Sequence, residues 1–429
     1  MVLGGRPGQV WRSSGRLADG REIIYFDESP GSGRAAVPDA RDLLSGTAAA
    51  EEPDGAGPAA AIADEAVAIA STVAALAGTA RPEPAEVAEP GGGLRWDPLA
   101  GEWVMYAAQR RERTFRPPVR ACPLCPSRPG HPTEIPAAGY DVVVFENRFP
   151  ALSGTEGGRC EVICFTADHE ASFGSLRPCR VRTVFEAWAD RTRELLALPA
   201  VQHVYCFENR GEEIGVTLTH PHGQVYAFPF VPPRTLRLLE LARAHRARTG
   251  GNLFDEVVSA ELADGRRIVA RNEHWTAFVP QAARWPFEVM IFPSVRVADL
   301  PAVAAPARDA FGPVYLDVLA SLDALFGAPM PYIAAWQQAP GQGVSPADRE
   351  EFGLHLHVMA IMRAPGRQKY LAGTESGAGA WSNDILPEAA AAMIRSAGDR
   401  DAVGDGGRAG GRQGCGGCGC GGLAGQEGA

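Results

Sequence analysis

The sequence has no apolar stretch long enough to cross a membrane. Its longest weakly apolar segment, residues 59–80, is mostly Ala and carries Asp64 and Glu65. The uncharged residues that follow this pair are fewer than the roughly 20 that a membrane-spanning helix needs. The N-terminal residues also lack the apolar run and the small-residue cleavage site of a secretory signal. We therefore expect no membrane segment and a cytoplasmic location.

A net positive charge is also missing, because the 429 residues carry a formal charge of −10. Much of the negative charge lies in residues 45–93, which are rich in Ala, Pro, Glu and Gly and almost devoid of aromatic residues. Such a segment cannot bury enough apolar surface to offset its ordering entropy, so the composition predicts a disordered linker. The rest of the chain is nearly neutral, and we expect no nucleic-acid surface.

Disulfide bonds are not expected in a reducing compartment, although the sequence has nine cysteines. Cys122 and Cys125 are separated by two residues, a spacing typical of metal ligands. The alternative is a reduced, exposed pair in a Pro-rich turn. The end of the chain, residues 397–429, is so rich in Gly that we expect a disordered tail in spite of its three cysteines.

The remaining residues predict an α+β protein with an internal repeat. Residues 1–44 contain a hairpin-like run that ends at Phe26, and we count them as part of the fold. The first repeat, 94–235, and the second, 236–396, each contain a Glu-Val strand, a helix, another strand and a closing His-x-His. Glu161 and Glu288 occupy corresponding places in this pattern. Two copies of one unit imply two antiparallel sheets that are joined or packed together.

The segment from His220 to Gln224, with the sequence His-Pro-His-Gly-Gln, carries the chemistry. It follows a polar loop and is expected to be a strand, in which alternation places both histidines and Gln224 on one face. A neutral imidazole can attack phosphorus, hold the phosphoryl group as a P–N adduct and release it to a second acceptor. The Gln224 amide can donate to a nonbridging phosphate oxygen. We therefore interpret His222 and Gln224 as catalytic.

These motifs resemble the galactose-1-phosphate uridylyltransferase family, a duplicated branch of the histidine-triad superfamily. The resemblance covers residues 94–396 and rests on the His-Pro-His-Gly-Gln string, Phe207-Glu-Asn209, the Cys122–Cys125 pair and the second His-x-His. It implies a double displacement: His222 takes UMP from UDP-glucose, glucose 1-phosphate leaves, and galactose 1-phosphate then accepts the UMP to give UDP-galactose. Met359 stands where Gln224 stands in the first copy, so we expect the second copy not to be catalytic.

The resemblance also implies metal sites. Cys122, Cys125, His169 and His220 match the family's ligands for a structural zinc, which would steady the strand that presents His222. A second family metal would use two further positions that are Leu238 and Gln337 here. Only His355 and His357 remain of that set, so we expect this second site to be empty or replaced by polar contacts.

Substrate contacts follow from the same resemblance. Polar and cationic side chains at matching positions would hold the nucleotide and its phosphates: Arg110, Arg113, Asn147, Arg148, Asn209 and Thr217. A later segment resembles the hexose-binding loop, with contacts expected from Lys369, Tyr370, Thr374 and Glu375. Trp381 replaces a polar residue of the family and is expected to stack on the sugar. In the family this loop reaches the partner subunit's site, which implies a homodimer.

Two other functions remain open on the sequence alone. An ADP-sugar or dinucleoside-polyphosphate phosphorylase would use the same His222 chemistry with adenine in place of uracil, and a few pocket contacts decide the base. A non-catalytic zinc-binding interaction module is the alternative from another class. That alternative predicts loss of the nucleophile, whereas His222 and Gln224 are both present.

Overall fold

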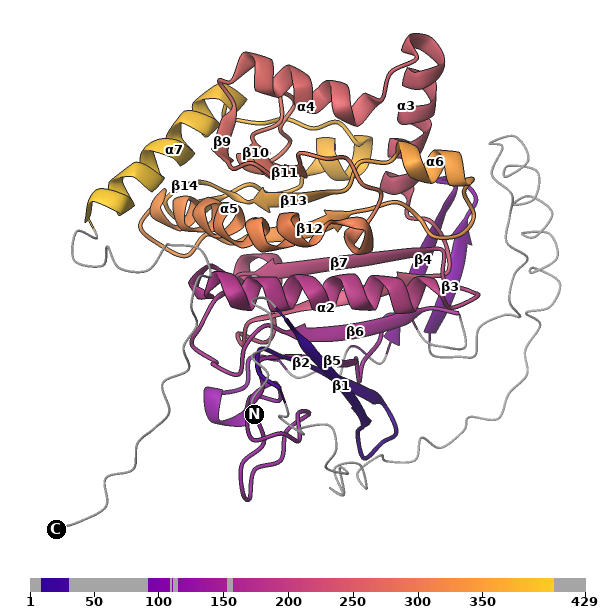
Figure 1. The fold of residues 1–429 in the computed structure, drawn as a ribbon, viewed down its shortest axis with the longest axis vertical. Helices are drawn as coiled ribbons and strands as arrows, with labels where there is room; N and C mark the ends of the chain where they lie inside the picture. The colour runs from indigo at the N-terminus through magenta and orange to yellow at the C-terminus, as the bar shows by residue number, and fades with distance from the viewer. Residues whose placement is uncertain (1–8, 31–91, 109, 111–114, 153–156, 405–429) are drawn as a thin grey trace, which may run out of the picture.

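A single antiparallel sheet of eleven strands organises the protein (Figure 1). The computed structural model describes residues 9–30, 92–108, 110, 115–152 and 157–404, so almost all of the expected linker and most of the expected tail lie outside the described residues. The strand order is β1-β2-β5-β6-β8-β7-β12-β13-β11-β10-β9. Among the described residues, no helix combines the length and the apolar character needed to cross a bilayer.

The bounds of the elements are as follows. The strands of the large sheet are β1 Trp11–Arg16, β2 Glu22–Asp27, β5 Val142–Glu146, β6 Arg159–Cys164, β7 His203–Arg210, β8 His222–Phe228, β9 Ile268–Arg271, β10 Trp275–Phe278, β11 Phe287–Pro293, β12 Tyr332–Gln337 and β13 His355–Ala360. Two hairpins lie outside it, β3 Gly92–Asp97 with β4 Glu102–Ala107, and β14 Met362–Ala364 with β15 Arg367–Gln368. The helices are α2 Pro178–Leu196, α3 Pro233–Thr249, α4 Leu253–Asp264, α5 Ala305–Ala324, α6 Pro346–Glu351 and α7 Pro387–Gly404.

The two halves of the sheet repeat one connectivity. In the first half β5 and β6 are followed by α2 and then by β7 and β8; in the second, β10 and β11 are followed by α5 and then by β12 and β13. The halves join edge to edge where β7 pairs with β12, with Asn209 opposite Ile333. Of the two arrangements that the repeat left open, the structure therefore has the joined sheet.

The strand register corrects the residue correspondence that we inferred from the repeated Glu-Val pairs. His222 lies opposite Cys164, and the equivalent His357 lies opposite Met290. Glu288 lies two residues before Met290, and Val162 lies two residues before Cys164. Glu288 therefore corresponds to Val162 rather than to Glu161. Because successive side chains of a strand point to opposite faces, a shift of one residue places the two glutamates on opposite faces of the sheet.

One face of the sheet is covered by α2, α5 and α7 (Figure 1). The helix that we expected in each repeat is confirmed, as α2 in the first and α5 in the second. Alternate strand residues such as Val204, Val225 and Val358 pack with these helices in the largest apolar cluster. The opposite face carries His222 and His357, and in the second half it is covered by α3 and α4, whose Leu239 and Phe254 join a separate cluster. The functional motifs therefore lie opposite the main core.

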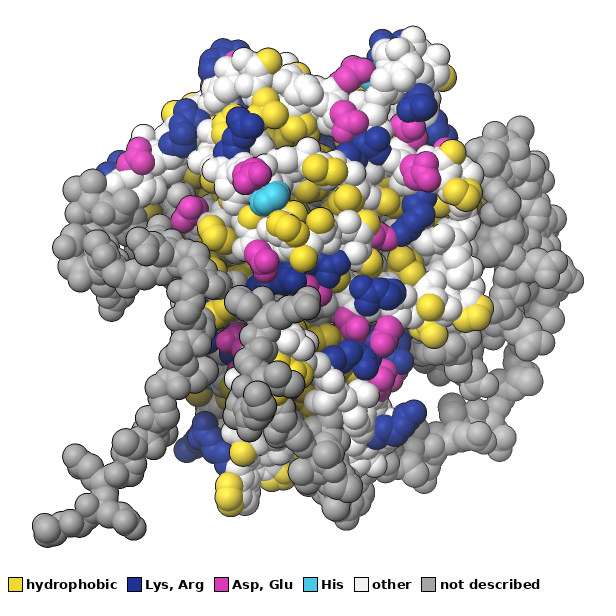
Figure 2. Space-filling model, viewed as in Figure 1, with side chains coloured by type: hydrophobic (Ala, Val, Ile, Leu, Met, Phe, Trp, Pro, Cys, Tyr) yellow, Lys and Arg dark blue, Asp and Glu magenta, His cyan; other side chains and the backbone are white. Residues whose placement is uncertain are grey.

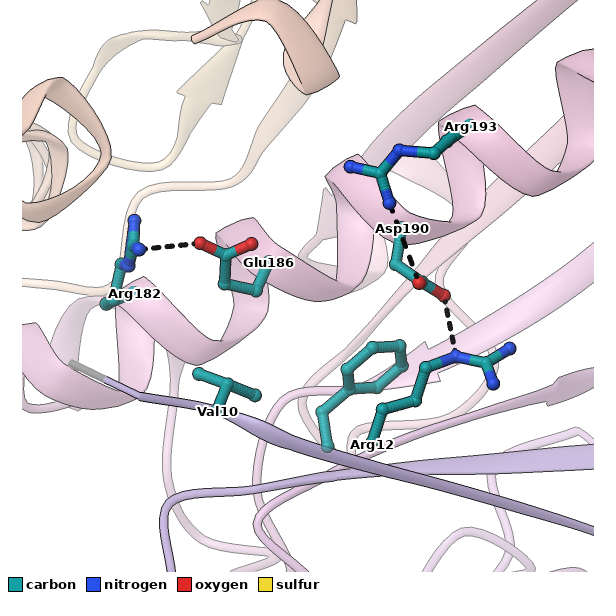
Figure 3. Close-up of a pocket in the computed structure, with 7 residues that line it drawn as sticks. Val10, Arg12, Arg182, Glu186, Asp190 and Arg193 are labelled. Carbon is teal, nitrogen blue, oxygen red and sulfur yellow. Dashed lines mark hydrogen bonds and ion pairs between the residues drawn. The ribbon is translucent and has the colours of Figure 1, made fainter. Parts of the chain in front are cut away.

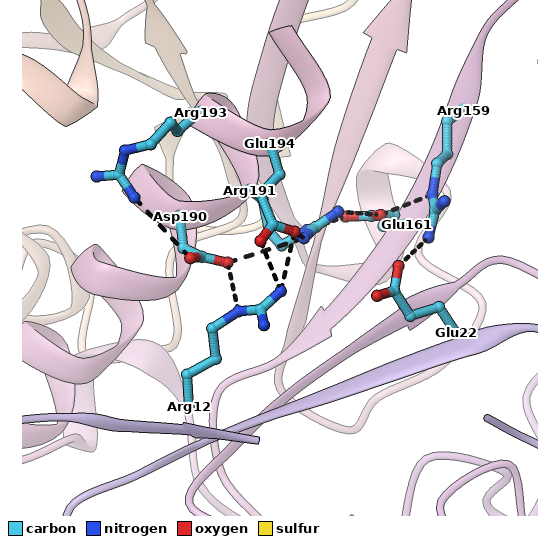
Figure 4. A network of polar contacts seen from close by, with 8 residues as sticks. All are labelled: Arg12, Glu22, Arg159, Glu161, Asp190, Arg191, Arg193 and Glu194. Atoms are coloured by element: carbon cyan, nitrogen blue, oxygen red, sulfur yellow. Dashed lines mark hydrogen bonds and ion pairs between the residues drawn. The ribbon is translucent and has the colours of Figure 1, made fainter. Parts of the chain in front are cut away.

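A buried ion pair ties the first half of the sheet to α2 (Figure 4). Both carboxylate oxygens of Glu161 on β6 accept from the Arg191 guanidinium on α2, at 2.8 and 2.9 Å. The side chains are 1% and 2% exposed, respectively. Arg159 also contacts Glu161 at 2.8 Å, and Arg12 of β1 joins the network through Asp190 and Glu194. The glutamate that the sequence pattern singled out in the first repeat is therefore a structural residue.

Replacing Arg191 by Met should lower the free energy of unfolding by about 3 kcal/mol, because a buried carboxylate loses its main partner. The matched control is Arg237→Met, since the Arg237–Glu240 pair is 3.2 Å long but exposed and should contribute less than about 1 kcal/mol. Urea unfolding followed by circular dichroism measures both. Equal losses in the two variants would show that the buried pair has no special role.

A pocket of about 320 Å³ lies between β1, β2 and α2 (Figure 3). Its charged side chains pair within the protein: Arg182 contacts Glu186 at 2.6 Å, and Arg12 contacts Asp190 at 3.0 Å. Figure 2 shows positive and negative side chains interspersed over the face in view. Phe26, which lines the pocket, belongs to the helix-side core, so the pocket lies on the face away from His222.

Candidate active site and metal centre

The imidazole of His222 is held so that one nitrogen stays available. His222 is the first residue of β8 and is half-buried. Its Nδ1 lies 2.8 Å from the backbone carbonyl oxygen of His220. Because a carbonyl oxygen only accepts, Nδ1 donates its proton and Nε2 keeps its lone pair. Burial lowers the pKa of His222, and the His220 carbonyl opposes that effect. The Nδ1 hydrogen bond and the lowered pKa together favour a neutral imidazole whose Nε2 is unprotonated.

Polar groups share the sheet face with His222. Gln224 follows two residues later on β8 and lies opposite Phe207 of β7, so Asn209 points to the same side. The Gln224 Oε1 atom is buried and has no hydrogen-bond partner within the described part of the chain. A buried amide without a partner is costly unless a ligand satisfies it. This amide therefore has an unsatisfied end on the face that carries His222.

Arg110, which follows β4, brings positive charge near Tyr226 of β8. Tyr226 lies four residues after His222 and therefore on the same face of the sheet. Burial raises the pKa of Tyr226 to about 12, while the nearby Arg110 opposes the rise. A cation at this position can attract the phosphates of a nucleotide bound over β8.

Gly223 allows β7 and β8 to approach closely beside the nucleophile. A Cβ atom at this position would lie 2.7 Å from the Phe207 carbonyl oxygen and 2.8 Å from Cζ of Phe165. Neither neighbour is a flexible side-chain end that can move away cheaply, since one is backbone and the other belongs to a buried ring. Glycine is thus required between His222 and Gln224 for steric reasons.

We expect Gly223→Ala to lower the rate at which a phosphoryl adduct forms on His222 about 100-fold, because separating the two strands displaces His222 by a fraction of an ångström or more. Rapid-quench measurement of adduct formation tests this. Gly139→Ala is the control, since a Cβ atom there has no heavy atom within 4 Å. A Gly223→Ala enzyme with the rate of the wild type would mean that the strands adjust without moving the nucleophile.

Four side chains from distant parts of the sequence form one cluster of metal-ligand type. The donor atoms of Cys122, Cys125, His169 and His220 all lie within 4.8 Å of one another. Cys125 Sγ lies 3.4 Å from His169 Nδ1 and 3.6 Å from His220 Nδ1. Sulfur and nitrogen ligands of a tetrahedral zinc are about 3.5 Å apart, given Zn–S and Zn–N bonds of roughly 2.3 and 2.0 Å. The residues therefore fit a zinc ion.

Neighbouring groups orient both histidines of the cluster. His220 Nε2 lies 2.8 Å from the Thr166 carbonyl oxygen and 2.8 Å from the Tyr140 hydroxyl. It therefore carries the proton, which leaves Nδ1 free to face the cysteines. Burial lowers the pKa of His220 to about 4, so the ring stays neutral. His169 is held similarly, with Nε2 at 3.1 Å from Thr219 Oγ1. Tyr140 and Thr166 carried no signal in the sequence, because their role depends on the folded contacts.

The histidines of the second repeat have other partners. His357 Nε2 lies 2.6 Å from Glu288 Oε1, and Nδ1 lies 2.9 Å from Nη2 of Arg234. His355 Nδ1 donates to the Gly353 carbonyl at 2.9 Å, and its ring stacks on Phe292. Both nitrogens of His357 are therefore occupied. Arg234 is a contact that sequence reasoning missed.

Comparison with known proteins agrees with this geometry. Residues 153–232 match the galactose-1-phosphate uridyl transferase N-terminal domain, and residues 239–402 match the C-terminal domain. The galactose-1-phosphate uridylyltransferase of Streptomyces lividans is 45% identical over 81% of this chain and 86% of its own length. The Thermotoga maritima enzyme of that name is 34% identical over 70% of this chain and 97% of its own. The chain belongs to the galactose-1-phosphate uridylyltransferase family.

Solved structures support the same fold. A uridylyltransferase structure aligns with a TM-score of 0.63 and 29% identity, covering 72% of this chain and 99% of its own. An ADP-glucose phosphorylase from Arabidopsis thaliana aligns with a TM-score of 0.57 but only 21% identity, over 71% of this chain and 99% of its own. The second likeness shows a shared fold and says nothing about which base this family member binds.

The other residues expected to contact the nucleotide either bond within the protein or lie outside the described residues. Asn147 uses Oδ1 to accept from the backbone of Phe149 at 2.9 Å, and the exposed Arg148 points to Glu134 at 3.5 Å. The Thr217 carbonyl accepts from the backbone of Arg116 at 2.9 Å. Arg113 lies outside the described residues. The nucleotide roles of these residues stay predictions.

The expected hexose-loop residues bond to one another. Lys369 Nζ lies 2.9 Å from Glu375 Oε1, and Thr374 Oγ1 donates to Glu375 Oε2 at 2.9 Å. The hydrogen bond from Lys369 is the largest cause of a lowered pKa at Glu375. Tyr370 is exposed, and Trp381 packs on Trp285 with ring centroids 5.7 Å apart. The loop is thus an ordered unit held by its own polar contacts.

Proposed function

We propose that this chain transfers UMP from UDP-glucose to galactose 1-phosphate by two displacements at His222. The observation that carries the proposal is the hydrogen bond from Nδ1 of His222 to the His220 carbonyl, which leaves Nε2 as a free lone pair. In the first step Nε2 attacks the α-phosphorus, and the bond to the oxygen of glucose 1-phosphate breaks. In the second, a phosphate oxygen of galactose 1-phosphate attacks the same phosphorus and the P–N bond breaks.

The surrounding groups support both steps. The developing charge on the α-phosphate oxygens is met by the Gln224 amide, whose buried end otherwise lacks a partner within the described residues. The positions of an amide's oxygen and nitrogen are exchanged by a half turn of the group, so its N–H can face the phosphate. In this proposal Arg110 and Asn209 contact the diphosphate. The His220 carbonyl stabilises the proton that stays on Nδ1 of His222 throughout.

We also propose that the Cys122, Cys125, His169 and His220 cluster holds zinc. When bound, the ion would serve a structural role, because four protein ligands complete a tetrahedral shell. His220 is both a proposed ligand and the residue whose carbonyl orients His222. Rigidity at His220 therefore passes directly to the nucleophile.

A homodimer completes the proposal. Lys369, Thr374 and Glu375 form a polar group on the loop that follows β15. We propose that this loop binds the hexose phosphate, with Lys369 on phosphate and Glu375 on sugar hydroxyls, and that it serves the site of a second subunit, as the family resemblance implies.

Incubation with UDP-glucose labelled at the α-phosphate tests the function. We expect a stoichiometric, acid-labile UMP adduct on His222, detected by peptide mass spectrometry, and its discharge by galactose 1-phosphate. ADP-glucose is the parallel substrate: an AMP adduct in place of UMP would favour an ADP-sugar phosphorylase. No adduct from either donor would favour the zinc-binding module.

A further inference from the structure

Glu288 is a buried carboxylate that accepts three hydrogen bonds from two different places. It lies on β11 and is 2% exposed. Its Oε2 accepts from the backbone N–H groups of Arg284 and Trp285, at 2.5 and 2.9 Å. Its Oε1 accepts from Nε2 of His357 at 2.6 Å. Burial would raise the pKa of Glu288, but the hydrogen bonds from His357 and from the backbone outweigh it and lower the pKa. The carboxylate thus joins the turn at 284–285 to β13.

His357 stands at the position that corresponds to His222 in the first repeat, yet it cannot act in the same way. His222 uses one ring nitrogen for a carbonyl and leaves the other free, whereas His357 gives Nε2 to Glu288 and accepts from Arg234 at Nδ1. It is also 1% exposed. The same point of the fold that presents a nucleophile in one half therefore provides a fixed anchor in the other.

The turn held by Glu288 supports the hexose loop. The Trp285 and Trp381 rings pack with centroids 5.7 Å apart, and the Arg284 guanidinium lies over Trp381 at 5.4 Å. Asn383, just after the loop, donates from Nδ2 to the carbonyl oxygens of Ala283 and Trp285, at 3.1 and 2.9 Å. Three consecutive residues, 283–285, therefore contact the Trp381 side chain and also Asn383 at the end of the loop.

The contacts form one continuous connection from the sheet to the hexose loop. His357 fixes Glu288, Glu288 fixes the backbone of 284–285, and this backbone and its side chains seat Trp381 and Asn383. At the far end, Lys369 and Ser382 both donate to Glu375 Oε1, at 2.9 and 3.1 Å. A shift of the turn would therefore move the proposed sugar-binding groups as a unit.

We propose that Glu288 and His357 are positioning residues for the sugar phosphate, and that the second repeat's histidine acts by seating the hexose loop. This inference rests on the proposed function. It assigns to the second copy of the motif a role in the acceptor step that is separate from UMP chemistry at His222.

The decisive variant is Glu288→Gln. A glutamine of the same shape has one accepting oxygen and one donating NH₂ group, so it cannot accept at both ends. Either the backbone N–H groups of residues 284 and 285 or the Nε2–H group of His357 then faces the NH₂ group of the glutamine, which cannot accept a hydrogen bond. We expect the KM for galactose 1-phosphate to rise about tenfold through misplacement of the loop. Transfer of UMP to His222 from UMP imidazolide, a donor that has no hexose, should change less than about twofold, because that step does not use the hexose loop.

The sequence offers a direct measure of loop position, because Lys369 is the only lysine in the chain. A lysine-specific protease can cleave the protein at this one position, and the native contact with Glu375 leaves the Lys369 side chain only 9% exposed. We expect Glu288→Gln to accelerate this cleavage about tenfold, since local opening exposes the site. Asn383→Ala removes the anchor from the loop side and should reproduce both effects.

Glu261→Gln is the matched control, because Glu261 is also a buried carboxylate of the second half, paired with Arg267 at 2.8 Å, but it belongs to α4. It should leave the KM and the cleavage rate unchanged. An unchanged KM for galactose 1-phosphate in Glu288→Gln, or an equal loss of UMP transfer from the hexose-free donor, overturns the inference. If the wild type accepts no UMP from either donor, the proposed function fails instead, and faster cleavage in Glu288→Gln would still show that Glu288 seats the loop.

Discussion

Replacing His222 by Gly is expected to abolish the UMP adduct and to lower kcat by a factor of about 10⁴ or more, as removal of an enzyme nucleophile typically does. Folding should be retained, because the ring is half-buried and, among the described residues, its side chain hydrogen-bonds only to the neighbouring His220 carbonyl. Initial rates of UDP-galactose formation, with mass spectrometry of the β8 peptide, measure both effects.

The control for this variant is His131→Gly, since His131 is an exposed histidine outside the metal-type cluster. It should keep full activity. Added imidazole should restore part of the UMP transfer in the His222→Gly cavity, because a free imidazole can occupy the space and attack phosphorus. Full turnover by His222→Gly without imidazole would show that another group is the nucleophile and would end the proposed mechanism.

Replacing Cys122 by Ser should remove the zinc and destabilise the first half of the protein. A serine hydroxyl is a poor zinc ligand, and we expect the zinc affinity to fall at least about 100-fold. In the same cluster, burial is the largest cause of a raised pKa of about 12 at Cys125, with Cys122 adding to it. A bound dication favours the thiolate instead, so zinc uptake should release protons.

Inductively coupled plasma mass spectrometry measures the zinc content. Thermal unfolding with and without a chelator measures the loss of stability. Cys179→Ser is the matched control, because Cys179 is half-buried on α2 and lies outside the cluster. It should keep about one zinc per chain and the melting temperature of the wild type. A Cys122→Ser protein with full zinc content would mean that the ion binds elsewhere or that the cluster holds none.

Features that depend on local contacts were easier to predict from the sequence than features that depend on long-range contacts. The helices α2 and α5 were predictable from apolar periodicity, because helical contacts are local in the sequence. The strand that carries His222 was expected to include His220, but β8 begins at His222. Pro221 has no N–H group to continue the hydrogen-bond ladder, which explains the shorter strand.

The internal repeat shows most clearly what the sequence could not predict, which is the register of the strands. Equal motifs suggested that Glu161 and Glu288 correspond, yet the register places them on opposite faces, where one pairs with Arg191 and the other with His357. A pattern read along the chain counts residues, whereas the face of a strand depends on hydrogen-bond pairing with its neighbours. A shift of one residue cannot be detected in the sequence pattern, but it decides which face of the sheet a side chain occupies.

The sequence by itself determined which side chains are available at β8, since the order His-Pro-His-Gly-Gln places two histidines, a sterically required glycine and an amide within five residues. It also predicted the four side chains that come together as the candidate metal cluster. Only the tertiary structure decided which nitrogen of each histidine is free, and that Tyr140, Arg234 and Glu288 are the partners that matter. The physical reason is that hydrogen-bond partners select the tautomer of an imidazole, and those partners come from strands and turns far apart in the chain.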